Sequence, residues 1–423
     1  MNLNDPGSTR SAGQGLLSLA LMDARNHTLH LFAQYQHALE AVHFAVPQLA
    51  AVNPPLWELG HLGWFQEWWI ARNMQRSLGT RCDSAHTRLA SIEPRADGWW
   101  NAEAVPHGAR WSLDLPDMSA CRAYLLDTLE GTLDLLEKTA LSGSRNGDND
   151  DALYFYRLCL CYEDMRSESL ASGAQALGLP LDETLQTAFT PRPMTVREPL
   201  VIPATVWQLG SVRGPGAGFA FDNEKPVHAV SVPEFEIDAQ PVTWAQYVEF
   251  VGDGAYDREE LWHPDGWRWL QALAASEGRR GPRYVDQIGI TSGAVIQNRF
   301  GVPRRMQPSQ PALHVSWWEA DAWCRWAGRR LPAEVEWELA AHTAARRGFY
   351  WGDVWEWMGT TFRPYPGFTP DPGQAYSQAS FGTHKVLRGA SFATRARMKT
   401  PRHRNFQLPE RDDVFCGFRS CAL

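Results

Sequence analysis

The residue pattern of this chain changes near Pro180, and the change limits the folds open to it. Before it, apolar residues recur every three or four positions, as in helices with one buried face. Asn53-Pro54-Pro55 opens the second such segment, and a polar loop at 142–151 precedes the fourth. The four segments read LLSLALMDARNHTLHLFAQYQHALEAV, LGHLGWFQEWWIARNMQ, CRAYLLDTLEGTLDLLEK and ALYFYRLCLCYEDMRSESLASGAQAL. We expect residues 12–180 to form a four-helix bundle.

The remainder of the chain predicts a different class of domain. Residues 181–199 are rich in proline without a helical period and are expected to be a linker, followed by an α+β domain over 200–423. HAVSVPEFEID predicts short strands. Ser316 and Glu319 have the spacing of a capping box, Gly328 ends that helix, and Pro332 is expected in the first turn of another. The fold class is therefore α followed by α+β.

Composition excludes several classes of function. The 423 residues carry 40 Lys+Arg against 48 Asp+Glu, so a net charge of -8 argues against nucleic-acid and membrane partners. No apolar run approaches the ~18 residues of a membrane helix, and the first residues lack the pattern of a secretory signal. Seven Cys are too few and too odd for a disulfide scaffold. We expect a cytoplasmic protein.

Aromatic residues are unusually frequent, with 20 Trp, 18 Phe and 11 Tyr, and several cluster, as Trp64, Trp68 and Trp69 do. Two explanations fit this clustering. The residues either fill a large core or line a pocket whose π faces suit a cationic ligand.

The second half contains several specific strings: PVTWAQYVEFV, PALHVSWWEADAWCRWAGRRLPAEVEWELAA, WGDVWEWMG, LRGASF and GFRS. Together they resemble the formylglycine-generating-enzyme-like domain, a C-type-lectin-like fold, over nearly all of 200–423. True formylglycine generators need a reactive Cys pair after the segment matching LRGASF, and FATRARMKTPRHRNF has none. Cys416 and Cys421 are expected to be buried small side chains. The resemblance therefore argues against sulfatase maturation.

An N-terminal DinB-like bundle joined to such a domain resembles the ergothioneine sulfoxide synthase and selenoneine synthase family over roughly 15–423. WELGHLGWFQEWW and ALYFYRL look closest to the selenoneine branch. The resemblance implies an oxidoreductase that uses non-haem Fe(II) and O2 to join a thiol or a selenosugar to hercynine, which is trimethylhistidine.

The family holds its iron with three His, and this sequence departs from that pattern. His61 matches the first ligand, after Trp57-Glu-Leu-Gly. The other two positions are occupied by Tyr162 and Arg166. A guanidinium is always protonated and cannot ligate a metal, and at ~4 Å a dication would repel it by roughly 8 kcal/mol at an effective dielectric of about 20. Fe(2+) is thus the cofactor that the resemblance implies, while the residues at two of its three ligand positions argue against its presence in this chain.

The residues at these three positions have more than one possible role. Tyr162 as a phenolate would favour ferric over ferrous iron. Arg166 is expected either to hold an anion or to pair with Glu58 or Glu168. His61 is either a residual ligand or a hydrogen-bonded core residue.

The segment 385–411 has eight basic residues and one acid, Glu410, which indicates an anion site or a solvated face paired with acids elsewhere. By family resemblance, Asn405 and Phe406 match the amide and the aromatic of the hercynine pocket. Gln407 stands where thiol-using members carry an acid, which favours a sugar donor. The predicted substrate-binding residues are Arg404, Asn405, Phe406, Gln407 and Arg411.

The loop after Trp357 supplies a reactive tyrosine in the family. Tyr365 is the candidate catalytic residue here, although Phe362 is an alternative match for that position. Two hypotheses follow: an enzyme that forms a C–Se or C–S bond on hercynine, or a metal-free paralogue that binds hercynine or a related betaine without turnover.

Overall fold

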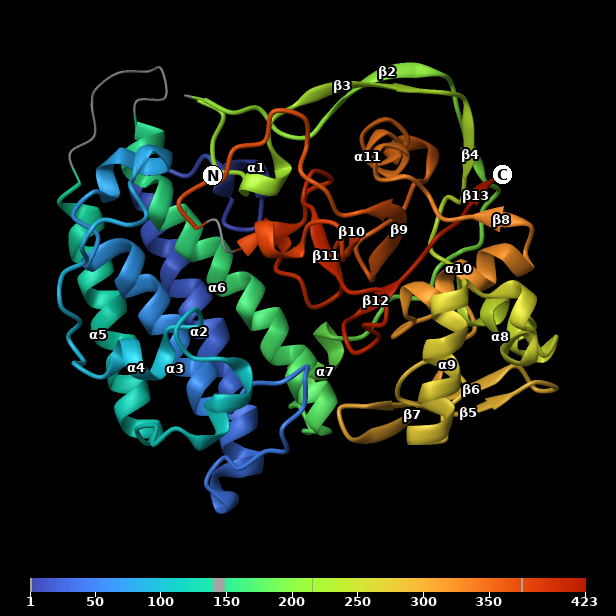
Figure 1. Ribbon diagram of the computed structural model, residues 1–423, viewed down its shortest axis with the longest axis horizontal. Coiled ribbons are helices and arrows are strands. Elements are labelled where there is room, and N and C mark those ends of the chain that lie inside the picture. Colours follow the sequence, from blue (N-terminus) through green and yellow to red (C-terminus); the bar gives the residue numbers. More distant parts are fainter. Residues whose placement is uncertain (1, 140–148, 215, 374–375) are drawn as a thin grey trace.

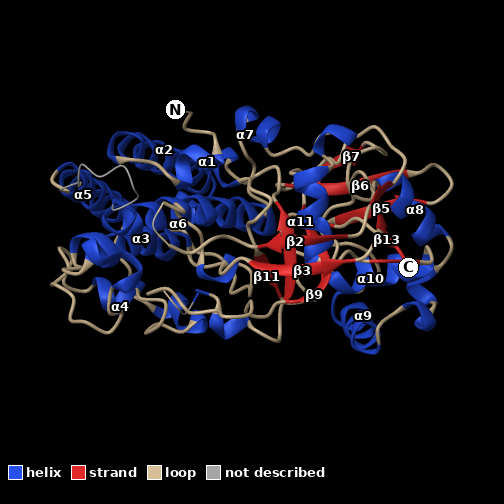
Figure 2. Cartoon of the chain, turned by 90° about the horizontal axis from the view of Figure 1, so that it is seen from above, coloured by secondary structure: helices blue, strands red, loops and turns tan. Residues whose placement is uncertain are grey.

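The computed structural model describes residues 2–139, 149–214, 216–373 and 376–423. A helical part and a part that contains the strands lie side by side (Figure 1). Seen from above, the strands gather on one side and the long helices on the other (Figure 2). The predicted fold class, a helical region followed by an α+β region, is confirmed.

All four predicted long helices are present. α2 packs against α6, and α3 against α5. The predicted loop at 142–151 lies mostly outside the described residues, and its last three residues already belong to α6. Two short helices, α1 and α4, were not predicted, and α7 lies inside the predicted linker. The helices are α1 (Pro6–Arg10), α2 (Gln14–Leu39), α3 (Pro55–Gln66), α4 (Ala96–Trp100), α5 (Met118–Glu137), α6 (Asn149–Leu177) and α7 (Glu183–Ala188).

Helix α3 begins at Pro55, where a proline costs no intrahelical hydrogen bond. Two glycines let it approach its neighbours closely. A Cβ on Gly60 would lie 2.0 Å from the Trp100 ring, and one on Gly63 would lie 2.9 Å from Tyr124 of α5. This close packing fixes the position of His61, which stands between the two glycines.

The described residues of the second region form four small sheets, with strand orders β1-β4-β13-β8, β11-β10-β9-β12, β2-β3 and β5-β6-β7. β10 runs antiparallel to β9 and β11, with Leu387 opposite Trp357 and Val386 opposite Phe406, whereas β12 is parallel to β9. The strands are β1 (Leu200–Ile202), β2 (Thr205–Leu209), β3 (His228–Val232), β4 (Phe235–Ile237), β5 (Val285–Gly289), β6 (Ala294–Arg299), β7 (Val302–Met306), β8 (Arg329–Arg330), β9 (Trp355–Thr361), β10 (Lys385–Gly389), β11 (Asn405–Gln407), β12 (Cys416–Gly417) and β13 (Cys421–Ala422).

The helices of this region are α8 (Trp244–Gly252), α9 (Pro264–Glu277), α10 (Trp317–Trp326) and α11 (Glu334–Thr343). The predicted capping box of Ser316 and Glu319 opens α10, and Gly328 follows it with φ of 64°. The strands predicted in HAVSVPEFEID are β3 and β4. The prediction for Pro332 is wrong: α11 begins at Glu334 with Ala333 as its N-cap, because the Glu336 carboxylate accepts the Ala333 N–H and fixes the start there.

Buried polar contacts join α6 to the second region. Arg397 Nε donates to Asp164 Oδ2 at 2.6 Å, and its Nη1 donates to Asp23 Oδ2 at 2.7 Å. One turn further along, Glu168 accepts from Trp355 and Thr394, each at 2.7 Å. These contacts fix α2 and α6 against the loop that follows β10, and α6 also against the start of β9.

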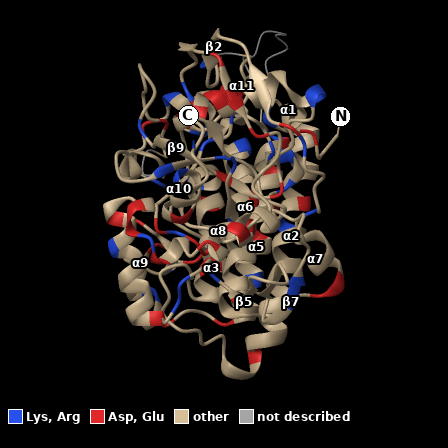
Figure 3. Cartoon of the chain, turned by 90° about the vertical axis from the view of Figure 1, so that its right-hand side faces the viewer, with Lys and Arg blue, Asp and Glu red and all other residues tan. Residues whose placement is uncertain are grey.

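The basic segment 385–411 is largely neutralised inside the molecule. Its arginines pair with carboxylates of both regions: Arg388 with Glu338, Arg395 with Asp23, Arg397 with Asp164, Arg404 with Glu334 and Arg411 with Asp413. Lys and Arg positions are interspersed with Asp and Glu positions in the view of Figure 3. The alternative of pairing with acids elsewhere is therefore confirmed, with much of the pairing buried rather than solvated.

All seven Cys are free and buried, so the prediction for Cys416 and Cys421 is confirmed. Among the described residues, no helix has the length and apolar character needed to cross a membrane.

The N-terminal helix is held by a buried carboxylate. Arg10 Nη1 donates to Glu224 Oε2 at 2.6 Å, and His403 lies 3.2 Å from Oε1. Burial raises the pKa of Glu224, but the charge of Arg10 and the hydrogen bond with His403 outweigh it and lower that pKa to about 2.

The lowered pKa predicts a pH dependence of stability. The ionised Glu224 stabilises the folded protein fully above the unfolded pKa of about 4.5, and its contribution, about 3 kcal/mol, is lost as pH falls to about 2. In urea unfolding, the difference in free energy of unfolding between the parent and Glu224→Gln should shrink by that amount across this window. A difference independent of pH would contradict the assignment.

Candidate functional site

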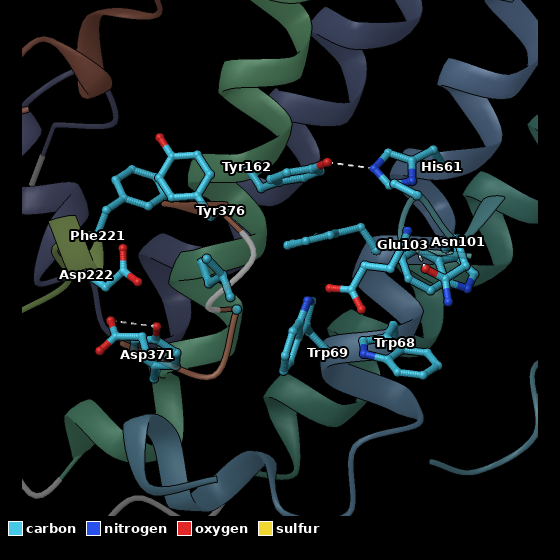
Figure 4. A pocket seen from close by; sticks show the side chains of 16 residues that line it. His61, Trp68, Trp69, Asn101, Glu103, Tyr162, Phe221, Asp222, Asp371 and Tyr376 are labelled. Atoms are coloured by element: carbon cyan, nitrogen blue, oxygen red, sulfur yellow. Dashed lines mark hydrogen bonds between the residues drawn. The ribbon is translucent and has the colours of Figure 1, made fainter. Parts of the chain in front are cut away.

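A cavity of about 280 Å³ lies where α3, the π-helical turn Glu67–Ala71 and α6 meet loops of the second region (Figure 4). Aromatic rings dominate its wall, so the pocket alternative for the aromatic clusters holds for part of them. The aromatic members are Trp64, Phe65, Trp68, Trp69, Tyr154, Tyr162, Phe221 and Tyr376. The polar members include His61, Asn101, Glu103, Asp222 and Asp371.

His61 is fixed by two hydrogen bonds. Its Nδ1 lies 2.7 Å from the Trp100 carbonyl oxygen and its Nε2 lies 2.6 Å from the Tyr162 hydroxyl. Because a carbonyl only accepts, Nδ1 carries the proton, and Nε2 accepts the Tyr162 O–H. The ring also stacks on Trp57, with centroids 4.7 Å apart. The lone pair of Nε2 is therefore used by Tyr162.

The electrostatics of the site keep both partners neutral. Burial, together with the charge of Arg166, lowers the pKa of His61 to about 4. Burial raises the pKa of Tyr162 to about 12, against the opposing effect of Arg166. The Tyr162 ring stacks on Phe65 at a centroid distance of 3.6 Å. Near pH 7 the pair is thus a neutral imidazole and a protonated phenol.

Arg166 forms an ion pair with Glu58, which was one of its two predicted partners. Its Nε donates to Glu58 Oε1 at 2.6 Å, while Asn53 Nδ2 donates to Oε2 at 2.7 Å. Burial raises the pKa of Glu58, but Arg166 outweighs it, and the net shift is downward. Arg110 donates to Asn53 at 2.6 Å and completes the network. The other predicted partner, Glu168, is turned to the second region instead.

These donors do not fit the three-histidine ferrous site that the family resemblance implies. One position is a phenol bound to the nitrogen that would face a metal, and the other is a guanidinium bound to a carboxylate. Among the residues that the structure describes, no group of three His, Cys, Asp or Glu lies close enough to share a metal ion. Of the three ligand positions, His61 alone carries a side chain that suits Fe(II).

Tyr365, the candidate catalytic residue, lies outside the cavity wall. Its hydroxyl accepts from Arg388 Nη2 at 2.9 Å, and the Arg404 guanidinium lies 4.0 Å from its ring centroid. Burial raises the pKa of Tyr365. Phe362, its alternative, is buried against Phe406 at a centroid distance of 4.1 Å. The structure therefore does not bring either residue to His61.

The predicted substrate-binding residues also stand outside the wall. Arg404 is buried in a pair with Glu334, Nε to Oε2 at 2.9 Å, and Arg411 pairs with Asp413. Asn405, Phe406 and Gln407 form β11. The Phe406 ring packs against a residue of the cavity wall, because its centroid lies 5.6 Å from that of Tyr376. The substrate-binding role of all five remains a prediction.

Sequence reasoning missed the part of the wall that the second region supplies. Phe221, Asp222, Asp371 and Tyr376 line the cavity opposite His61 (Figure 4). They come from two loops about 150 residues apart, and neither loop carries a periodic pattern. The only available signal was the alternation of aromatic residues and an acid in Phe219-Ala-Phe221-Asp222.

The comparisons with known proteins agree with this two-part architecture. Residues 185–353 and 350–422 match the sulfatase-modifying factor enzyme 1-like domain, and the chain belongs to that family. Within it, a formylglycine-generating enzyme of Streptomyces coelicolor is 33% identical but covers only 38% of this chain and 52% of its own.

Two relatives span both regions. Hercynine oxygenase of Mycolicibacterium thermoresistibile is 29% identical over 95% of this chain and 94% of its own length. That of Mycolicibacterium smegmatis is 30% identical over 87% of this chain and 90% of its own. This protein is therefore a member of the hercynine oxygenase family.

The Arg166–Glu58 pair predicts a large effect on stability. Arg166→Met leaves the Glu58 carboxylate buried without a cation, and the free energy of unfolding should fall by about 3–5 kcal/mol. Adding Glu58→Gln removes the stranded charge and should restore most of the loss. Chemical denaturation of the parent, both single variants and the double variant measures the coupling. Additive effects would contradict a direct ion pair.

Proposed function

We propose that this chain binds hercynine, or a closely related betaine, in the aromatic cavity beside His61. Hercynine combines an imidazole, a carboxylate and a trimethylammonium group. A quaternary ammonium donates no hydrogen bond and is recognised by π faces. The observation that carries the proposal is a cavity of about 280 Å³ with eight aromatic side chains in its wall, in a member of the hercynine oxygenase family.

The proposal includes loss of the three-histidine iron site. Tyr162 uses the Nε2 lone pair of His61, and Arg166 keeps a permanent positive charge beside it. Restoring a ferrous site would require breaking the Tyr162 hydrogen bond and displacing Arg166 from Glu58. The protein would then be a binding protein that descends from an oxygenase.

Turnover is the second candidate function, and the similarity to hercynine oxygenases over 87–95% of the chain favours it. In that case the chain would use O2 to join hercynine to a thiol or a selenosugar. The Gln407 position and the strings WELGHLGWFQEWW and ALYFYRL favour the selenosugar. The predicted residues of β11, with Arg404, Arg411 and Tyr365, would then contribute from behind the cavity wall.

Two measurements separate the candidates. Calorimetric titration of the parent with hercynine should show saturable binding. Anaerobic reconstitution with Fe(II), followed by metal analysis, should leave the parent without stoichiometric iron. The variant that combines Tyr162→His with Arg166→His should gain about one iron per chain, because three neutral imidazoles suit Fe(II).

The matched control adds His61→Ala to that double variant, and it should abolish the gained iron. If the parent binds iron as well as the double variant does, the proposed loss of the site is wrong. If the parent binds no hercynine, the proposed ligand is wrong.

A further inference from the structure

The cavity wall contains a carboxylate that the protein leaves without a counter-ion. Asp222 opens the 3-10 turn Asp222–Glu224 and is only 4% exposed. It lies across the cavity from His61 (Figure 4). Its burial raises its pKa, with the neighbouring Asp371 acting in the same direction.

The two carboxylate oxygens of Asp222 differ in their contacts. Oδ1 accepts a hydrogen bond from Ser377 Oγ. Oδ2 is buried and has no hydrogen-bond partner among the described residues, and no Lys or Arg of that part of the chain forms an ion pair with Asp222. A buried carboxylate with no cation beside it is costly, even with the hydrogen bond from Ser377 and the backbone N–H groups of Asn223 and Asp371 nearby, so the site favours a positive charge beside the carboxylate.

Asp371, the other acid on this side of the cavity, provides a contrast. Its Oδ2 accepts from Lys225 Nζ at 2.7 Å and from the Tyr154 hydroxyl at 3.0 Å, and its Oδ1 lies 3.3 Å from Arg213 Nη2. Two cations of the protein thus already neutralise Asp371. Of the two acids, Asp222 alone retains an unbalanced charge for a ligand.

The surroundings of Asp222 are aromatic. Phe221 precedes it in the wall, and the Phe221 and Tyr376 rings lie 5.1 Å apart. Tyr154 also lines this end of the cavity. A carboxylate among π faces suits a cation that makes no hydrogen bonds, because the faces and the charge together replace its hydration.

We propose that Asp222 is the counter-ion for the quaternary ammonium of the ligand, which places the imidazole of a betaine toward His61. This inference rests on the proposed function and adds the orientation of the ligand and the chemical class it must have, a quaternary ammonium. An imidazole that lacks the ammonium gains nothing from Asp222.

The test uses Asp222→Asn, which keeps the shape of the side chain and the acceptor for Ser377. Calorimetric titrations with hercynine and with tetramethylammonium chloride compare it with the parent. Both ligands should bind about tenfold or more weakly to the variant. Affinity for 3-(imidazol-4-yl)propionate should not fall, which shows that the cavity is intact. Asp127→Asn, the same change at an exposed position of α5, serves as the control for net charge.

The outcomes separate this inference from the proposed function. Parent-like hercynine affinity in Asp222→Asn overturns the role of Asp222 but leaves the proposed function standing. Tetramethylammonium binding that depends on Asp222, without hercynine binding, upholds the cation subsite and overturns hercynine as ligand. If the parent binds neither hercynine nor tetramethylammonium, both the role of Asp222 and the proposed function are wrong.

Discussion

The buried ion pair between Asp164 and Arg397 holds helix α6 against the second region, and the candidate site depends on that contact. One wall of the cavity comes from α3 and α6, and the other comes from the loops around Asp222 and Tyr376. Because Glu168, one turn along α6, accepts three hydrogen bonds from the second region, the helix is fixed there at two points. The cavity is therefore a product of both regions together.

The chemistry on the bundle side follows from how charge is neutralised along α6. Glu163 pairs with Arg25 inside the bundle, Asp164 pairs with Arg397, and Arg166 pairs with Glu58. The Arg166–Glu58 pair stands beside a neutral His61 whose Nε2 accepts from Tyr162. Glu58, His61, Tyr162 and Arg166 thus all have protein partners. Of the wall carboxylates without an ion pair among the described residues, Glu103 is exposed to solvent, whereas Asp222 is buried and lies across the cavity from His61. This difference in burial is the physical basis for the proposed orientation of a cationic ligand.

Local patterns in the sequence predicted the features that depend on residues close together in the chain or on the charge of a single residue. Apolar spacing predicted the four long helices, the Ser316 and Glu319 spacing predicted the start of α10, and the charge of Arg166 predicted a carboxylate partner. The prediction for Pro332 failed because the Glu336 carboxylate accepts the Ala333 N–H, so that Ala333 is the N-cap and α11 begins at Glu334. Among the helices that line or support the cavity, α2, α3, α5 and α6 were predicted, but the short α4 was not.

The far wall could not be predicted, because it depends on which loops the second region folds against α6. Nothing in the local sequence distinguishes Asp222 from Asp371, yet Asp222 has only the hydroxyl of Ser377 as a side-chain partner among the described residues, and Asp371 is paired with Lys225 and Arg213. Likewise, the basic segment that contains Arg404 has the composition of an anion site, but in the fold Arg404 forms an ion pair with Glu334. The family resemblance directed attention to His61, which lines the cavity. Three of the pocket residues that it implied form β11 instead, where Phe406 packs against Tyr376 of the wall.

His61 is hydrogen-bonded to Tyr162, and we propose that it binds no metal and that the cavity beside it binds a betaine. The most direct test is a crystal structure of the protein grown anaerobically with Fe(II) and hercynine, with diffraction recorded on both sides of the iron absorption edge. We expect no anomalous peak at His61 Nε2, an intact hydrogen bond to Tyr162, and a quaternary ammonium beside Asp222. An iron peak within bonding distance of Nε2, with Tyr162 or Arg166 displaced, would contradict it.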